Sequence, residues 1–405
     1  MFVLVHGSGL SYMLCRSLDS RLGALSGAVV SCGGLLAAGY ANAVWQLCLA
    51  QGVLVGFGAA ISTSAAVDVL DGVVLPRAVE EMLGGSAIIT AAIGVGGGAL
   101  SLCARQLAVT SSSSGIALRW LALVVFCGQL LGVVFMKGCA DQGNCDGTLS
   151  DVDEDAAVCF DAQDVKADCC SGHMHRPDLS LDKPAPGTSL VGESRFGSMR
   201  RACTRVLETA QRAFGSRKLA ASFLTDVLHH LGAFVPLMFL PGYVSTQLNN
   251  SQPLSGAVFL AIICFASAAG SLIGSFVASM IPAHVGLWQC ASRLGLSLSV
   301  WCLWLPAADS WAMVYAFSLV YGLLLGSTNS ASCSSLLDLD LAAARIRACG
   351  CCAAVLVGVP AAGCLFIGTE LGDYYVPTVT FVASTSLLAA AVDAVTWWVL
   401  QRQEQ

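Results

Sequence analysis

Long apolar stretches follow one another along most of this chain, separated by short polar turns. A helix that crosses a membrane needs about 20 mainly apolar residues. The pattern predicts ten such helices, at residues 25–44, 47–67, 83–103, 118–136, 222–245, 254–281, 286–306, 311–336, 343–368 and 376–400. A shorter apolar run at residues 1–15 would bring the number of helices to eleven. The alternative is that this run is the core of a signal peptide, but no charged segment precedes it.

A long polar segment at residues 137–221 divides the helices into five before it and six after it. We therefore expect an incomplete amino-terminal bundle at 1–136, a cytosolic central loop, and a six-helix bundle at 222–400. A short cytosolic tail is expected at 401–405. The charged, Pro- and Gly-containing composition of the central loop favours disorder.

Composition supports a membrane protein. Apolar residues make up 56% of the chain and charged residues only 11%, whereas soluble domains carry about 25% charged residues. A chain of 405 residues with so little charge could not cover the surface of two or three soluble domains. The expected fold class is therefore an all-α integral membrane protein.

The basic residues indicate the orientation, because cytosolic loops are enriched in Lys and Arg. With the central loop in the cytosol, 17 of the 20 basic residues lie on that side. Eleven are in the loop, and the others are Arg16, Arg21, Arg77, Arg345, Arg347 and Arg402. Only Arg105 and Arg119 fall outside, and Arg293 lies within a helix. We expect a multi-pass protein, in the plasma membrane rather than an organelle, with a cytosolic C-terminus.

Several segments resemble the major facilitator superfamily, in particular its monocarboxylate-transporter-like members, with the fungal-type monocarboxylate porters nearest. They are "RLGALSGAVVSCGGLLAAGYANAVWQLCLAQGVLVGFGAA" (21–60), "RAVEEMLGGSAIITAAIGVGGG" (77–98), "LGAFVPLMFLPGYV" (231–244) and "LVGVPAAG" (356–363). The resemblance implies two helical bundles around a central cavity, and solute transport by alternating access. Relative to the family, the first helix is missing.

Two further departures concern functional positions. In the family's gate turn, Arg21 and Gly23 match, while Asp19 stands one place early. Ser275 stands where the family has an arginine that the resemblance implies as the partner of the substrate carboxylate. Its absence leaves monocarboxylate transport open, with Arg293 as a conceivable replacement.

Ionisable residues and prolines gather in the helix predicted at 222–245. Asp226, His229 and His230 share one helical face, and an Asp–His pair suits proton coupling. The alternative is that Asp226 lies among lipid headgroups. Pro236 and Pro241 free the carbonyls of the residues four positions earlier, so they predict a kinked helix that either gates transport or only packs. Pro360 has the same expected role in its own helix.

Other polar groups within predicted helices are weaker candidates. A buried Arg293 can pair with a carboxylate substrate, or instead pair with Asp226 or Asp393 at a cytosolic gate. Four side chains with polar tips are candidates for lining the cavity, although aromatic residues also serve packing: Tyr243, Trp301, Tyr315 and Asn329. Glycines four residues apart, in "GSLIG" (270–274) and "GLLLG" (322–326), predict closely packed helices.

No cofactor, metal or nucleic-acid partner is expected. The stretch 151–178 contains Cys and His residues, but their spacing matches no strong zinc pattern, and its Asp151/Asp153/Asp155 series does not complete a calcium loop. The six histidines and the scattered serines give no catalytic constellation, so an enzyme is not expected. The expected partners are a small-molecule solute, protons and membrane lipid, and the oligomeric state stays open.

Three functional interpretations follow. The first is a secondary transporter of a small organic solute, most specifically a monocarboxylate moved with a proton. The second is a transporter of the same fold for another, neutral solute, which the missing arginine favours. The third is a non-transporting membrane protein or a truncated gene product, which the missing first helix favours.

Overall fold

The computed structural model describes residues 20–72, 77–111, 113–143, 217–247, 255–281, 284–334, 341–367 and 375–404. All regular elements in these ranges are helices. Of residues 137–207, which separate from the rest of the chain, only 137–143 are described, as the end of one helix. The apolar run at 1–15, Asp19 and the Cys- and His-containing stretch at 151–178 lie outside the description.

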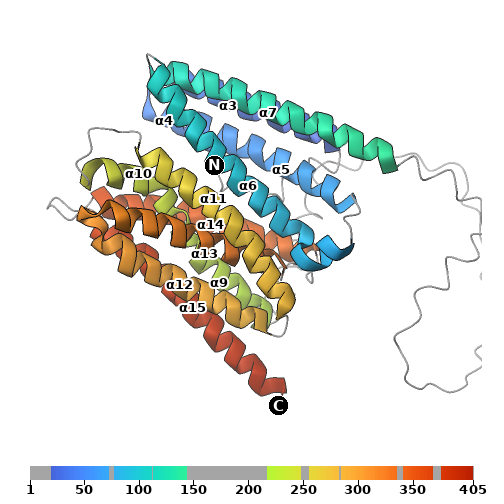
Figure 1. Ribbon diagram of the computed structural model, residues 1–405, viewed down its shortest axis with the longest axis vertical. Coiled ribbons are helices and arrows are strands. Elements are labelled where there is room, and N and C mark those ends of the chain that lie inside the picture. The colour runs from blue at the N-terminus through green and yellow to red at the C-terminus, as the bar shows by residue number, and fades with distance from the viewer. Residues whose placement is uncertain are drawn as a thin grey trace, which may run out of the picture. The chain divides into compact units, whose positions relative to one another are not determined.

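The helices before the central segment follow each other with short connections (Figure 1). They are α3 (Ser20–Gly39), α4 (Val44–Leu47), the π-helix η1 (Cys48–Leu54), α5 (Val55–Gly72), α6 (Arg77–Thr110) and α7 (Ser114–Gly143). Because α4, η1 and α5 run on without a gap, they make up one membrane-length helix with an internal π-helical section.

The helices after the central segment contain one interrupted span and one span that changes helix type along its length. They are α9 (Arg217–Ala233), α10 (Val235–Gln247), α11 (Ser255–Met280), α12 (Val285–Ser299), the π-helix η4 (Val300–Trp304), the 3₁₀-helix η5 (Leu305–Asp309), α13 (Trp311–Ser334), α14 (Leu341–Ile367) and α15 (Val376–Glu404). The span of α9 and α10 is interrupted at Phe234, whereas α12, η4 and η5 run on without a gap.

Each of the ten helices predicted in the described ranges corresponds to one helical stretch of the structure. The ends differ: α9 begins at Arg217, and α15 continues to Glu404 through most of the segment expected as a tail. Eight of the described helices are long and apolar enough to cross a membrane by length and composition alone. The α12 span is not among the eight, and α14 offers only a shorter apolar helix at Ala353–Leu365. The chain is thus an all-α integral membrane protein, as its composition predicts.

A large hydrophobic core lies among the helices of the carboxy-terminal half. Its fully buried side chains include Leu240, Phe259, Trp304, Phe317 and Tyr321. A smaller cluster in the amino-terminal half joins α3, α5 and α7 through Leu35, Val55 and Ala122. By contrast, α7 exposes Trp120, Leu131 and Phe135, as expected for a helix whose outer surface faces lipid.

Glycines allow α11 and α13 to approach each other closely. A Cβ added to Gly274 would lie 2.7 Å from the Cα of Ser327, and one on Gly322 would lie 2.5 Å from the carbonyl oxygen of Ile263. A Cβ on Gly326 would collide with the backbone of Ser267. The close packing predicted from the four-residue glycine spacing is confirmed.

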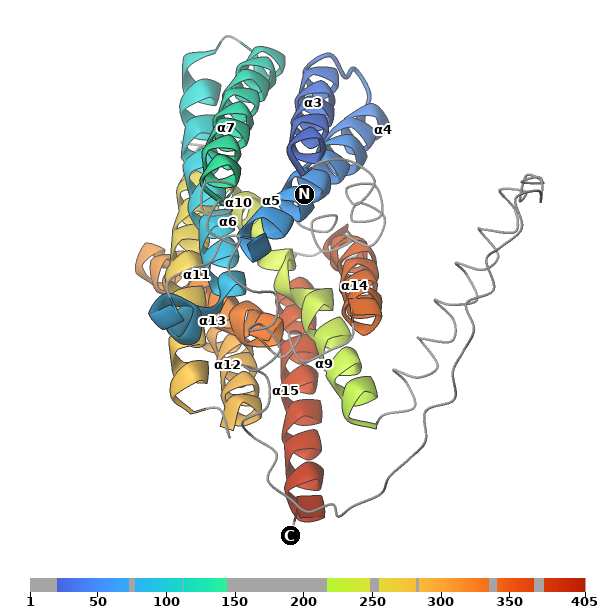
Figure 2. The same ribbon diagram turned by 90° about the vertical axis from the view of Figure 1, so that its right-hand side faces the viewer.

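A second close contact joins the two halves of the chain. Helix α6 lies beside α11 in both views (Figures 1 and 2). Gly94 of α6 faces the backbone of α11, where a Cβ would lie 2.7 Å from the Cys264 carbonyl oxygen and 2.9 Å from the Ala268 nitrogen. This contact brings the middle of α6, in the first half, against the middle of α11, in the second.

The packing of α13 on α11 gives a testable prediction. Replacing Gly326 with Ala should lower the thermal stability of the purified protein, because the added methyl group meets a backbone carbonyl that cannot rotate away. The expected cost is about 1–3 kcal/mol, typical of an overpacked core. Gly96→Ala is the control, because a Cβ at Gly96 meets nothing within 4 Å. Equal melting temperatures for the two variants would contradict this packing.

Candidate transport site

The span formed by α9 and α10 is interrupted at Phe234, a turn residue between the two helices. Pro236, two residues later, has no N–H to donate to the carbonyl of Gly232. The next carbonyl, that of Ala233, accepts a hydrogen bond of 2.8 Å from the Tyr321 hydroxyl of α13. A neighbouring helix therefore satisfies a backbone group at the break, as a membrane interior requires.

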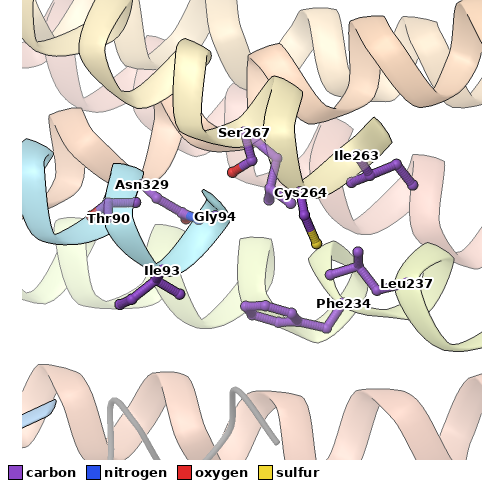
Figure 3. Close-up of a pocket in the computed structure, with 10 residues that line it drawn as sticks. Thr90, Ile93, Gly94, Phe234, Leu237, Ile263, Cys264, Ser267 and Asn329 are labelled. Carbon is purple, nitrogen blue, oxygen red and sulfur yellow. The ribbon is translucent and has the colours of Figure 1, made fainter. Parts of the chain in front are cut away.

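A pocket lies directly beside this break (Figure 3). Its space, counting the part open to solvent, is about 570 Å³. The lining comes from α6, from both sides of the break, from α11 and from α13, and consists of Thr90, Ile93, Gly94, Phe234, Leu237, Ile263, Cys264, Ser267, Leu325 and Asn329. The pocket thus lies where the two halves of the chain meet.

The chemical character of this lining is apolar with a few neutral polar groups. Thr90 and Ser267 supply hydroxyls, Asn329 an amide and Cys264 a thiol. In Figure 3, Thr90 and Asn329 are drawn on one side of the pocket, and Phe234 and Leu237 on another. No charged side chain is among the described residues that line it. Such a lining can hydrogen-bond a small polar molecule but offers an anion no cationic partner.

Arg293 of α12 does not line the pocket, and instead holds two carboxylates inside the carboxy-terminal bundle. Its Nη2 donates to Oδ1 of Asp226 on α9 at 2.6 Å, and its Nη1 donates to Oδ2 of Asp393 on α15. The side chains of Arg293 and Asp226 are 1% and 3% exposed. We call these three residues the ion cluster. It joins α9, α12 and α15 through charge-assisted hydrogen bonds.

The two predicted histidines lie on α9 between the ion cluster and the break. His230 Nδ1 lies 2.8 Å from the backbone carbonyl oxygen of Asp226, and the His230 ring is 6.0 Å from the ring of Phe234. The ring of His229 packs edge-on against His230 at 5.2 Å. His229 is fully buried, and neither of its ring nitrogens has a hydrogen-bond partner among the described residues.

The four side chains expected to line a cavity lie in different environments. Asn329 lines the pocket. Tyr243 is buried in the core, edge-on to Tyr375 at 4.8 Å and to Trp304 at 6.1 Å. Trp301 and Tyr315 are 39% and 48% exposed, and neither lines the pocket.

The remaining sequence candidates lie away from the pocket. Arg21 and Gly23 belong to the first turn of α3. Pro360 is inside α14 and exposed. Ser275, at the position of the family's arginine, is buried on α11. Sequence reasoning did not single out Thr90, Phe234, Cys264 or Ser267, because residue types this common in membrane helices carry no signal of their own.

Comparisons with known proteins agree with this architecture. No protein-family model matches the chain. Monocarboxylate transporter 2 of Mesocricetus auratus is 22% identical to it over 417 residues, covering 100% of this chain and 76% of that protein. Among solved structures, the xylose transporter XylE from E. coli, in a partially occluded inward-open conformation, has a TM-score of 0.59 with 10% sequence identity. That match covers 96% of this chain and 84% of XylE.

The two comparisons are complementary. The structural match reports the fold alone, and the full-length sequence match points to the same branch of proteins as the motifs in "RLGALSGAVVSCGG" and "LGAFVPLMFLPGYV". Together with the membrane-length helices, they show a multi-pass integral membrane protein that shares the fold of the xylose transporter and is similar in sequence, along its full length, to a monocarboxylate transporter.

Proposed function

We propose that this protein is a secondary-active transporter that moves a small monocarboxylate together with a proton by alternating access. The similarity to a monocarboxylate transporter supports the substrate class. The pocket supports the mechanism, because it lies between α6 of the first half and the helices of the second. A site at such a boundary can be exposed to either side of the membrane when the two halves rock.

The uncharged lining of the pocket is the observation that supports coupling of transport to a proton. A carboxylate that enters this pocket loses its hydration and finds hydroxyl, amide and thiol groups but no cation among the described lining residues. Burying an unpaired charge in this way is strongly unfavourable. A proton that travels with the carboxylate removes the charge, so that the pocket holds a neutral occupant.

The same lining also supports a second candidate function, the transport of a neutral polar solute. Ser275 replaces the arginine that the family resemblance implies for binding a carboxylate. Arg293 does not replace it at the pocket, because Asp226 and Asp393 hold its guanidinium. A neutral solute would need no proton, so the two candidates differ in their dependence on pH.

Uptake measurements separate these candidates. Uptake of labelled pyruvate into proteoliposomes should be faster at acid than at neutral external pH, by up to about tenfold per pH unit for one coupled proton, and a protonophore should abolish accumulation.

Replacing both His229 and His230 with Gln should flatten this pH dependence of uptake, because histidine titrates near neutral pH. Protonophore-insensitive uptake of a labelled neutral sugar, without pyruvate uptake, would favour the second candidate. Binding without any uptake would contradict both.

The pocket itself can be tested with two adjacent residues. Asn329→Ala removes an amide from the lining and should reduce uptake at low substrate concentration about tenfold, the usual effect of losing a hydrogen bond to a substrate. Ser330→Ala is the control on the same helix, because Ser330 is buried on α13 but is not among the described lining residues. Equal uptake by both variants would place the substrate elsewhere.

Alternating access predicts that linking α6 to α11 stops transport. A Cβ at Gly97 would lie 3.8 Å from the Cβ of Cys264, which is about the mean separation across a disulfide. In Gly97→Cys, oxidation should therefore join the native Cys264 to α6 and abolish uptake, and a reductant should restore it.

Two controls accompany this cross-link. Gly97→Ala should transport normally with and without oxidant, because the extra methyl group meets only ordinary contacts. Gly97→Cys combined with Cys264→Ala should be insensitive to oxidant. Full uptake by a quantitatively cross-linked protein would contradict a rocking motion at this contact.

A further inference from the structure

Within the carboxy-terminal half of the chain, the pocket has two walls. One wall consists of Phe234 and Leu237 at the break between α9 and α10, and the other belongs to α11 and α13. We infer that Tyr321 of α13 sets the distance between these walls through its hydrogen bond to the Ala233 carbonyl, and thereby selects the solutes that fit. The selection of solutes rests on the proposed function, whereas the distance between the walls does not.

The wall formed by α11 and α13 is a rigid unit. A Cβ on Gly322 of α13 would lie 2.5 Å from the Ile263 carbonyl oxygen, and one on Gly270 of α11 would collide with the Leu323 carbonyl. Because each helix presents a glycine to the backbone of the other, neither can slide along its partner without a collision. This unit carries the lining residues Ile263, Cys264, Ser267, Leu325 and Asn329.

The opposite wall is anchored to different neighbours. A Cβ on Gly358 of α14 would collide with the Leu231 carbonyl, and one on Gly232 would lie 3.2 Å from the Cα of Val382 on α15. Figure 2 shows α9 running between α14 and α15. The end of α9, where this wall begins, therefore belongs with α14 and α15.

Tyr321 joins the two walls beside the pocket. Its side chain is fully buried, and its hydroxyl donates to the Ala233 carbonyl oxygen at 2.8 Å. Tyr321, Leu325 and Asn329 follow each other at intervals of four residues, so they share one face of α13. The hydrogen bond therefore lies at the edge of the lining, one turn from Leu325 on one wall and one residue from Phe234 on the other.

The wall at the break lacks part of its own backbone bonding. Pro236 has no N–H for the Gly232 carbonyl, and Pro241 has none for the Leu237 carbonyl. Two helical hydrogen bonds are thus missing around the segment that carries Phe234 and Leu237. The position of this wall therefore depends on its bonds to neighbouring helices, such as the one to α13.

The distance between the walls can be measured without transport, from the reactivity of the Cys264 thiol. Cys264 is on the α11 side of the pocket, so its rate of reaction with N-ethylmaleimide depends on how far the walls stand apart. Tyr321→Phe removes the hydroxyl and keeps the ring. The rate should rise about three- to tenfold in this variant, the population change expected from losing one hydrogen bond. Mass spectrometry of the Cys264 peptide gives the rate, with the exposed Cys103 of α6 as internal reference.

Solute selection is measured by uptake of two labelled acids at one pH, pyruvate and the bulkier branched-chain keto acid of leucine. The wider pocket of Tyr321→Phe should lower the ratio of pyruvate uptake to branched-acid uptake about three- to tenfold. A purely structural role of Tyr321 would reduce both uptakes together and leave the ratio unchanged. Tyr315→Phe is the matched control, because Tyr315 is on the same helix, is 48% exposed and is not among the described lining residues.

The outcomes separate this inference from the proposed function. An unchanged rate at Cys264 in Tyr321→Phe, or an equal rise in Tyr315→Phe, overturns the role of Tyr321 whatever the wild type transports. If the rate rises but the wild type takes up neither acid, Tyr321 sets the distance between the walls and the proposed function fails. If the rate rises and the uptake ratio stays the same, the selection of solutes by Tyr321 is overturned.

Discussion

Hydrocarbon offers no hydrogen-bond partner to a peptide group, and this constraint governs how the chain can fold and where it can be irregular. Apart from the turn at Phe234, the backbone of the described residues is helical across every span. The break at Phe234 occurs next to Tyr321, whose hydroxyl supplies a donor to the Ala233 carbonyl. The irregular backbone is therefore placed where a protein group can satisfy it, and the pocket lies at that same place.

Charge obeys the same rule as the backbone. The carboxy-terminal bundle places Arg293 in its interior, and that arginine is tolerable only because α9 and α15 both bring a carboxylate to it. The arrangement keeps the two ion pairs of Arg293 away from the pocket, whose described lining residues carry no charge. Ion pairing and solute binding thus occupy different parts of the bundle, and α9 is the element that belongs to both.

Much of the fold could be predicted from the sequence, because each span must be long and apolar on its own account. The proline-containing break in α9–α10 and the close packing of α11 on α13 were predictable from Pro236 and from the glycine spacing. The pocket was not, because Thr90 and Ser267 are ordinary helix residues until α6 and α11 are brought together. Arg293 shows what sequence alone does not determine. Its position within an apolar helix is compatible with a partner in the substrate or in the protein, and the arrangement of α9, α12 and α15 shows that its partners are Asp226 and Asp393.

The contact between α6 and α11 has a consequence for mechanics. Gly94 meets the backbone of α11 directly, and Gly97 adds only an ordinary contact with Cys264. At Gly94 no side chain of α6 has to reorder when the helices move, so movement there carries little side-chain entropy cost, whereas one turn later the ring of Phe265 packs over Gly98. At Gly94, the two halves of the chain can therefore pack closely and still move relative to each other.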